Sequence, residues 1–190
     1  MESGAVEKKE IFNMNIEQLK NEYAQGKQFK YVFFWGHKKF NKITKTCFSQ
    51  WYECKFTVDG VEYHTAEQYM MAQKAVLFGD KEVLQKIMSA DNPAVYKSLG
   101  RQIRNFDENI WNEHKFQIVV NGNMAKFSQN PELLDFLLKT GDRVLVEASP
   151  YDRIWGIGLA KDTPDIENPF KWKGINLLGF ALMEVRENLK

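Results

Sequence analysis

Two charged side chains stand in a stretch of sequence that is otherwise largely apolar. In the segment TAEQYMMAQKAVLF, Glu67 and Lys74 are surrounded by alanine, methionine, valine and leucine, which predicts a buried helix. Residues seven positions apart lie two turns apart on one helix face, about 10 Å along the axis. Because desolvation makes an unpaired buried charge costly, the two groups form a structural ion pair, reach solvent at their ends, or face a common pocket. In a pocket, burial would lower the pKa of the lysine and make its amine nucleophilic.

A second group of chemically useful side chains follows a predicted strand. In VEASPYDRIWGIGLAK, Glu147 ends the strand, and a proline and two glycines predict a sharply turned loop after it. Asp152 and Trp155, three residues apart in that loop, would place a carboxylate beside an indole. A turn acid and a core tryptophan also explain this pattern, so both interpretations stay open.

Basic side chains at two places are candidates for phosphate contacts. Arg101 and Arg104 lie near a glycine, and the fork of an arginine guanidinium makes paired hydrogen bonds to phosphate. The lysine-rich loop 36–46 follows Phe34 and Trp35, so it could touch both the backbone and the bases of a nucleic acid. Its lysines are Lys38, Lys39, Lys42 and Lys45. Ordinary solvated surface positions are the alternative for all these cations.

The start of the last predicted helix is a further candidate site. Trp172 and Asn176 lie at its mouth, and a helix N-terminus offers free N–H donors to a phosphate. The alternative is an ordinary cap, with Arg186 on the solvated face of the helix.

Metal ligands and reactive thiols are sparse in this sequence. Cys47 and Cys54 have no adjacent base, and they are too few for the disulfide scaffold of a small secreted protein. The three histidines, His37, His64 and His114, are scattered, so a structural zinc site is not expected. Neither GxGxxG nor GxxxxGK[ST] occurs. We therefore expect neither a metal nor a common nucleotide-binding fingerprint.

The elements that must position these side chains are predicted from periodicity and capping residues. Strands are predicted at 30–35 and 143–149, and a hairpin at 54–64 around Asp59-Gly60. Gly122 weakens its helix by about 1 kcal/mol relative to alanine, which predicts a break there. Helices are predicted after the caps Asn15, Thr65, Asp80, Asn92, Asp107 and Asn130, and over about 175–188. This order predicts an α+β fold that is mostly helical with a few short strands.

Composition and charge narrow the class of protein. The chain has 190 residues, 44% of them hydrophobic, which fits a single compact domain at 27–190 after a leader, 1–26, with a short helix. Its 26 basic and 25 acidic side chains argue against a nucleic-acid grip built on bulk charge. The N-terminus lacks the pattern of a signal peptide, and no apolar stretch is long enough to span a membrane. We expect an intracellular, cytoplasmic protein rich in aromatic side chains, which fill a core or stack on flat ligands.

Several of these segments, taken together, resemble the YbiA-like or NADAR domain family. The motifs are YHTAEQYMMAQKA, SLGR, AKF, VEASPYDRIWGIG and KGINLLGFALMEVR, and the resemblance runs from about Tyr31 to Glu187. It implies a compact, mainly helical α+β fold and N-glycosidase activity, which releases bases or amines from ribosyl groups. The substrates it implies include riboflavin-pathway intermediates and ADP-ribose attached to guanine.

The resemblance implies catalytic roles for three residues. The acid of the family's E-[QH]-Y helix falls on Glu67, the lysine of that helix on Lys74, and the acid of its E-A-S-x-x-D-x-x-W-G run on Asp152. In the mechanism this favours, Lys74 attacks C1′ of a ring-opened ribosylamine to form a Schiff base that water hydrolyses, while Glu67 and Asp152 move protons. Direct hydrolysis, in which a carboxylate stabilises the positively charged sugar, is the alternative.

The same resemblance implies a binding set. The tryptophan of the acidic run falls on Trp155, with Glu147 at the head of the run. The arginine of L-G-R falls on Arg101 and the asparagine after W-x-G on Asn176, and these two would bind phosphate and ribose hydroxyls. The other candidate walls around a flat base are Phe34, Trp35 and Trp172. No cofactor or metal is implied.

Three functions stay open at this point. The first is removal of ADP-ribose from guanine in nucleic acid or nucleotides, with transient DNA or RNA contact. The second is cleavage of a riboflavin-pathway ribosylamino-pyrimidine phosphate. The third is a non-catalytic module that binds ADP-ribose, which would need the arginine and aromatic contacts but not an acid and a lysine.

Overall fold

The structure, a computed structural model, describes residues 14–190, so the first half of the predicted leader, residues 1–13, lies outside the described part. The α-helices are α1 (Ile16–Ala24), α2 (Ala66–Leu77), α3 (Lys81–Ser89), α4 (Pro93–Gly100), α5 (Glu108–Ser128), α6 (Pro131–Leu138) and α7 (Leu177–Asn188). The strands are β1 (Tyr31–Phe34), β2 (Phe56–Val58), β3 (Val61–Tyr63) and β4 (Val144–Glu147), and the short 3-10 helices are η1 (Lys45–Phe48) and η2 (Pro169–Lys171). None of the helices in residues 14–190 has the length and apolar character needed to cross a membrane.

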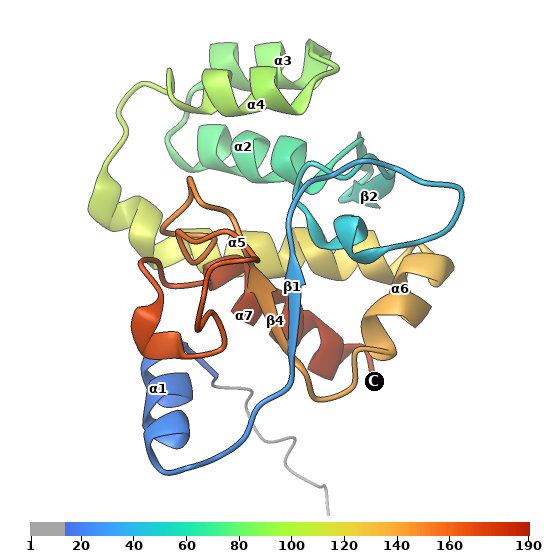
Figure 1. Ribbon diagram of the computed structural model, residues 1–190. Coiled ribbons are helices and arrows are strands. Elements are labelled where there is room, and N and C mark those ends of the chain that lie inside the picture. Colours follow the sequence, from blue (N-terminus) through green and yellow to red (C-terminus); the bar gives the residue numbers. More distant parts are fainter. Residues whose placement is uncertain (1–13) are drawn as a thin grey trace, which may run out of the picture.

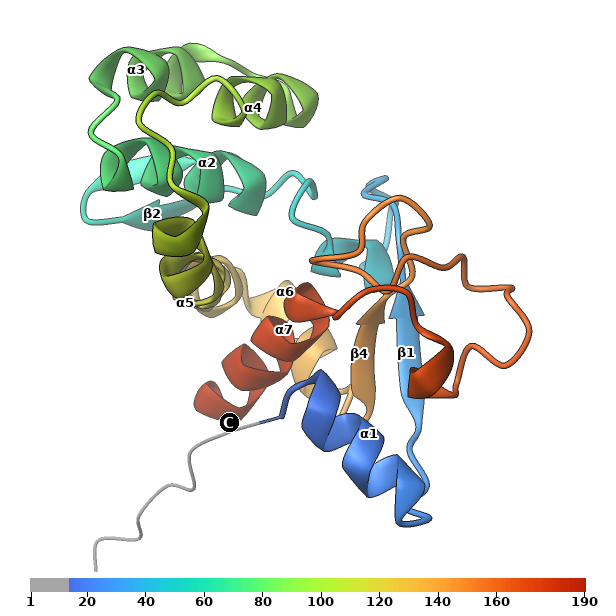
Figure 2. The same cartoon turned by 90° about the vertical axis from the view of Figure 1, so that its left-hand side faces the viewer.

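Two strands that are far apart in the sequence form a parallel pair at the centre of the fold. β1 and β4 run in register from Tyr31 opposite Val144 to Phe34 opposite Glu147. Helix α7 packs on β4 and on α5, as Figure 1 and Figure 2 show. Because the two strands are parallel, their carboxyl ends meet at one edge of the sheet, where ligands commonly bind in open α/β sheets.

Helix α2 is the centre of a second, helical part of the molecule. It packs against α3, α4 and α5, and α3 and α4 lie above it in Figure 2. Predicted caps form at its start and at the start of α3: Thr65 Oγ1 accepts the Gln68 N–H at 3.0 Å, and Asp80 Oδ1 accepts the Val83 N–H at 3.2 Å. The expectation of a mostly helical α+β fold with a few short strands is confirmed.

The predicted hairpin is also present. β2 and β3 pair antiparallel around Asp59 and Gly60, whose φ angles are 50° and 78°. Positive φ at both central residues is the geometry of a type I′ turn, which matches the twist of paired strands.

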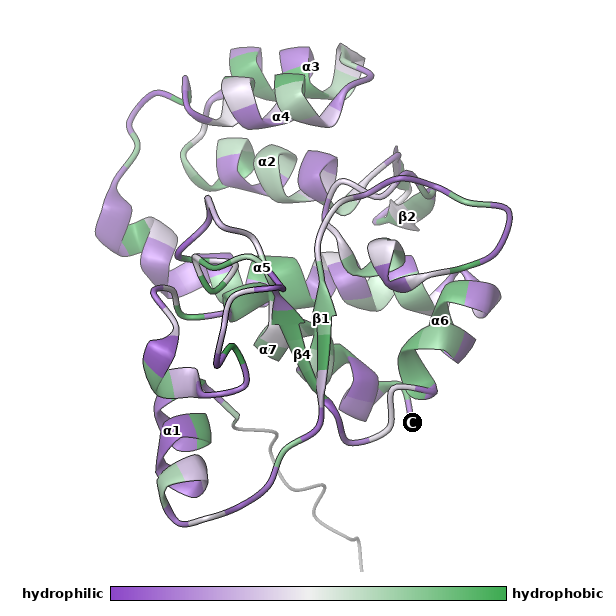
Figure 3. Ribbon diagram, in the orientation of Figure 1, coloured by the Kyte–Doolittle hydropathy of each residue, from purple (hydrophilic) through white to green (hydrophobic). Residues whose placement is uncertain are grey.

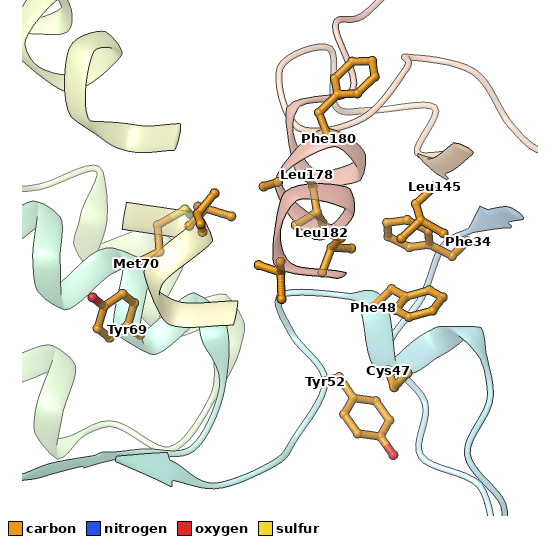
Figure 4. Close-up of a cluster of buried hydrophobic side chains, with 14 of the residues drawn as sticks. Phe34, Cys47, Phe48, Tyr52, Tyr69, Met70, Leu145, Leu178, Phe180 and Leu182 are labelled. Carbon is orange, nitrogen blue, oxygen red and sulfur yellow. The ribbon is translucent and has the colours of Figure 1, made fainter. Parts of the chain in front are cut away.

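The core joins the parallel strands to the helices around them. Figure 3 shows that β1 and β4 are among the most hydrophobic segments, and Figure 4 shows Phe34 beside Leu145, above Phe48. The rings of Phe34 and Phe48 meet edge to face with centroids 5.5 Å apart. Phe34, which we expected to line a binding site, is 1% exposed and lies in this core.

One local expectation and one of the open alternatives need correction. Helix α5 continues through Gly122, where we expected a break. A Cβ at this position would lie 2.5 Å from Cδ1 of Tyr69, so glycine allows α2 and α5 to approach closely. Arg186 is not on a solvated face: it is 1% exposed, and its Nη1 donates to Thr140 Oγ1 and to the Arg143 carbonyl, both at 2.8 Å.

The predicted short helix near the N-terminus forms as α1. Asn15 caps it, with Oδ1 accepting the N–H groups of Glu17 and Gln18 at 3.0 Å. Leu19 is fully buried, and α1 packs beside η2. This part of the predicted leader therefore belongs to the packed structure.

Candidate active site

Three carboxyl groups from different elements influence one another electrostatically where the parallel strands end. Glu147 is the last residue of β4, and Asp152 lies in the loop that follows it. Glu67 lies in the first turn of α2, where its N–H donates to the Gln50 carbonyl at 2.8 Å. We call Glu67, Glu147 and Asp152 the acid cluster.

The Glu67 carboxyl is buried, with 4% of the residue exposed. Burial raises its pKa to about 7, and the charge of Asp152 acts in the same direction. Lys97, a hydrogen bond from the Trp51 side chain and Arg101 lower the same pKa, and they do not offset the burial. A carboxyl with a pKa near 7 is divided between its acid and its base form at neutral pH, as a general acid or base requires.

The Glu147 carboxyl has no hydrogen-bond partner for its buried Oε2 atom among the described residues. Burial raises its pKa to about 8, and the charges of Asp152 and Glu67 add to that effect, while Lys97 opposes it. Glu147 therefore holds its proton at neutral pH. A buried polar atom without a partner is rare in native structures, which makes this oxygen a candidate for contact with another molecule.

Asp152 is held rigidly by its own loop. Its Oδ1 accepts the N–H of Ile154 at 2.9 Å and that of Trp155 at 2.7 Å. The loop turns back so that the Ile157 N–H donates to the Glu147 carbonyl at 3.0 Å. The turn-acid interpretation is thus correct in geometry, and the same turn brings Asp152 to the acid cluster.

Two cations accompany the acids, and only one of them, Arg101, was a candidate from the sequence. Arg101 caps the C-terminus of α4, and Lys97 lies one turn earlier on that helix; both are exposed. Lys97 Nζ lies 5.9 Å from the ring centroid of Trp51, whose other aromatic neighbour is His37 at 5.4 Å. Neither Lys97 nor Trp51 lies in a motif that the sequence singled out. The packing of α4 against α2 brings Lys97 to Glu67, and a hydrogen bond from its side chain associates Trp51 with the same carboxyl.

Lys74 lies apart from the acid cluster. Its Nζ donates to the Gly100 carbonyl at 2.9 Å and stands 4.2 Å from the ring centroid of Phe106 and 5.4 Å from that of Trp111. Burial lowers the pKa of this half-buried ammonium. The charges that act on Glu67 are those of Lys97, Asp152 and Arg101, so Lys74 makes no ion pair with Glu67. The contact with Gly100 fixes the end of α4 that carries Arg101.

The predicted aromatic walls separate into two groups. Trp35 is 55% exposed just after β1 and lies 6.3 Å from Tyr151, which precedes Asp152. Trp155 is half-buried and packs against the core. Trp172 is buried, and its Nε1 donates to the Ile166 carbonyl at 2.6 Å, so it lies in the interior beside Tyr31.

The remaining candidates are placed as follows. Arg104 makes a two-pronged ion pair with the buried Asp80 carboxylate, at 2.7 and 3.0 Å, so its guanidinium is committed to structure. Asn176 is fully buried and hydrogen-bonded to the backbone of β4. The lysine loop 36–46 is largely exposed and leaves the sheet directly after Trp35. Within residues 14–190, no group of three or more His, Cys, Asp or Glu side chains could hold a metal ion.

The chain as a whole is similar to known proteins. The model of the NADAR domain family matches residues 33–190. The chain is 52% identical over 165 residues to N-glycosidase R617 of Acanthamoeba polyphaga mimivirus, covering 83% of this chain and 95% of the relative. It is 34% identical over 142 residues to N-glycosidase YbiA of Escherichia coli K12, covering 75% of this chain and 80% of that one. The NMR structure of the E. coli protein YbiA superposes with a TM-score of 0.69 at 30% identity and covers 86% of each chain.

Proposed function

Since the chain belongs to the NADAR domain family and is an N-glycosidase like its relatives, we propose that the acid cluster hydrolyses the bond between C1′ of a ribose and a nitrogen of a base. The observation that carries this proposal is the pairing of two carboxyls whose pKa burial raises, Glu67 and Glu147, with an Asp152 held by its own loop. Breaking this bond requires a proton for the departing nitrogen and a negative charge beside the sugar, and the cluster offers both.

In the proposed reaction Glu67 donates its proton to the base nitrogen as the C1′–N bond breaks. The positive charge that develops on the ribose is stabilised by the Asp152 carboxylate, as in glycoside hydrolysis. A water molecule then adds to C1′ and gives up a proton, which restores Glu67. Glu147, protonated at neutral pH, donates a hydrogen bond to a ribose hydroxyl or to the incoming water.

We further propose that the substrate is an ADP-ribosyl group on guanine, in nucleic acid or in a nucleotide. Lys97 and Arg101 are exposed beside the acids and would bind the two phosphates. Trp35 and Tyr151 offer exposed aromatic faces for a base at the rim. The lysine loop after Trp35 would add contacts to a polynucleotide backbone.

Lys74 is the nucleophile in a second route to the same products. Its lowered pKa favours the free amine, which would add to C1′ of a ring-opened substrate, displace the base nitrogen and leave a Schiff base for water to hydrolyse. This route requires Lys74 to leave the Gly100 carbonyl and cross to the acid cluster. Borohydride reduction during turnover would trap a lysine adduct, detectable by mass spectrometry, and its absence would rule this route out in favour of direct hydrolysis.

The function is tested by mass spectrometry of the products from a panel of ribosylated bases. The panel holds ADP-ribosyl-guanosine, an oligonucleotide carrying ADP-ribosyl-guanine, and a ribosylamino-pyrimidine phosphate. We expect release of the unmodified guanine compound from the first two substrates. Preferential cleavage of the third would overturn the proposed substrate, and binding of all three without cleavage would overturn the proposed reaction in favour of a binding module.

A further inference from the structure

Both polar groups of the Asn176 side chain are hydrogen-bonded to the backbone of one strand, β4. Its Oδ1 accepts the N–H of Glu147 at 3.0 Å, and its Nδ2 donates to the Leu145 carbonyl at 2.9 Å. The residue has none of its surface exposed. A ribose or phosphate contact would therefore have to displace hydrogen bonds that the fold already uses.

The backbone of Asn176 is tied to the loop that carries Asp152. Its N–H donates to the Gly156 carbonyl at 3.2 Å, and the next two residues donate to the carbonyls of Ile154 and Trp155, both at 3.1 Å. Asn176 thus joins three segments, the end of β4, the loop from Asp152 to Gly158 and the start of α7. Two members of the acid cluster lie on the segments it joins.

The conformation of this junction is unusual and closely packed. Asn176 has a φ of 55°, in the left-handed region that favours glycine and tolerates asparagine. One turn into α7, a Cβ on Gly179 would lie 2.0 Å from the Leu145 carbonyl oxygen and 2.4 Å from Asn176 Nδ2. The helix and strand can approach this closely only with glycine at that position.

We propose that Asn176 is a positioning residue, which holds the Glu147 backbone and the Asp152 loop in the mutual geometry that the acid cluster needs. This inference rests on the proposed function and assigns Asn176 no contact with substrate. The charged groups that bear on Glu147 are Asp152, Glu67 and Lys97, and only the first two belong to the cluster. Loosening the junction would move Glu147 and Asp152 relative to each other and to Glu67.

The test compares Asn176→Gly with Asn168→Gly. Glycine keeps the left-handed backbone accessible and removes the whole side chain, with both of its hydrogen bonds to β4. Asn168 is the matched control, because its Oδ1 also caps a backbone N–H, that of Phe170 at 3.0 Å, at η2 in the segment leading to α7. We expect Asn176→Gly to lower kcat at least tenfold with KM within twofold of wild type, and Asn168→Gly to leave both unchanged. A rise in KM with kcat retained would overturn the proposal in favour of a substrate ligand.

A second measurement does not depend on turnover. Carboxyl-carbon NMR, assigned with Glu147→Gln, follows the titration of Glu147, and we expect its pKa in Asn176→Gly to move by at least one unit from the wild-type value. An unchanged titration in a folded variant would contradict the proposal. If Asn176→Gly does not fold, Asn176→Asp keeps the Oδ1 acceptor for the Glu147 N–H and loses the Nδ2 donor to the Leu145 carbonyl, and a smaller kcat loss without a KM change is expected. Failure of wild type to release any base would remove the proposed function, while the NMR shift would still report on the junction.

Discussion

Buried charged side chains fall into two sets, the cations Lys126 and Arg186 and the acids of the acid cluster, and their surroundings differ. On one side, the cations Lys126 and Arg186 are almost fully buried. Lys126 Nζ donates to the carbonyls of Cys47 and Ser49 at 2.7 and 2.9 Å, and Arg186 donates to Thr140 and to the Arg143 carbonyl. These cations fix the η1 segment and the turn before β4, so their charges serve the fold.

In contrast, the buried Glu67 carboxyl is hydrogen-bonded by the Trp51 side chain, and the buried Oε2 atom of Glu147 has no hydrogen-bond partner among the described residues. Burial and mutual repulsion raise both pKa values. The two cations donate to backbone carbonyls, although Arg186 Nε has no hydrogen-bond partner among the described residues, whereas burial disfavours the charged form of both acids. That contrast supports the proposal that the acid cluster is functional, because stability alone would select against buried acids whose charged form is disfavoured.

Substitution of Glu67, a member of the acid cluster, should have the largest effect on the rate of base release. We expect Glu67→Gln to lower the rate of base release at least 100-fold at neutral pH, because the amide cannot donate a proton. The matched control is Glu132→Gln, since Glu132 also lies in the first turn of its helix but is exposed. Rates within threefold of wild type for both variants, measured by chromatography of the free base, would remove Glu67 from the reaction.

Substitution of the buried cation Lys126 should lower the stability of the protein and leave turnover unchanged. Lys126→Met would leave the carbonyls of Cys47 and Ser49 without donors, so we expect the free energy of unfolding to fall by about 3 kcal/mol. Lys115→Met, on the same helix but bonded only to Asn112, should change it by less than about 0.5 kcal/mol. Urea unfolding measures both. A Lys126→Met protein that is as stable as wild type would show that the buried cation is not a structural anchor.

The pH dependence of stability should distinguish the acids from other groups. Folding raises the pKa of Glu67 from its usual range near 4 to about 7, so the folded state binds this proton more tightly than the unfolded state. The resulting stabilisation is complete below about pH 4 and is lost as pH rises through 7. Between pH 6 and pH 9 we expect wild type to lose about 1.4 kcal/mol more than Glu67→Gln. Parallel pH curves for the two proteins in urea titrations would contradict the assigned burial.

The smallest effect concerns the two arginines that the sequence presented as equivalent. Arg101→Ala should raise KM about tenfold for a phosphate-bearing substrate, the cost of one charge-assisted contact. Arg104→Ala should leave KM unchanged and lower stability, because it breaks the ion pair with Asp80. Initial-rate kinetics with ADP-ribosyl-guanosine separate the two. A KM increase of equal size in both variants would show that the phosphate region is wider than Arg101 and Lys97.

Local signals in the sequence predicted most of the elements. Thr65, Asp80 and Asn92 cap their helices because a short polar side chain can satisfy the free N–H groups there, and Asp59-Gly60 forms its turn for similar local reasons. The parallel pairing of β1 with β4 could not be read this way, because it depends on contacts between distant segments.

The site was predicted only in part, for the same reason. Glu67 stood out as a charge in an apolar helix, and Glu147 and Asp152 as acids around a strand end. Lys97 sits on an exposed helix face with no distinguishing neighbours, so only tertiary packing associates it with the acids. Lys74 lies on the same helix as Glu67, but its ammonium donates to the Gly100 carbonyl of α4 and not to the glutamate. Spacing along one helix does not determine which of these two groups the lysine contacts.

The central claim is that protonated, buried carboxyls drive cleavage of the N-glycosidic bond, and the pH profile of kcat for base release tests it most directly. Glu67 and Glu147 have pKa values of about 7 and 8, and because they interact, the profile reports the pair. We expect kcat of wild type to fall as pH rises from 7 to 9. In Glu67→Gln, we expect the pH profile of the residual rate to lack the transition with the lower pKa. A kcat that rises or stays level across this range in wild type would contradict the claim.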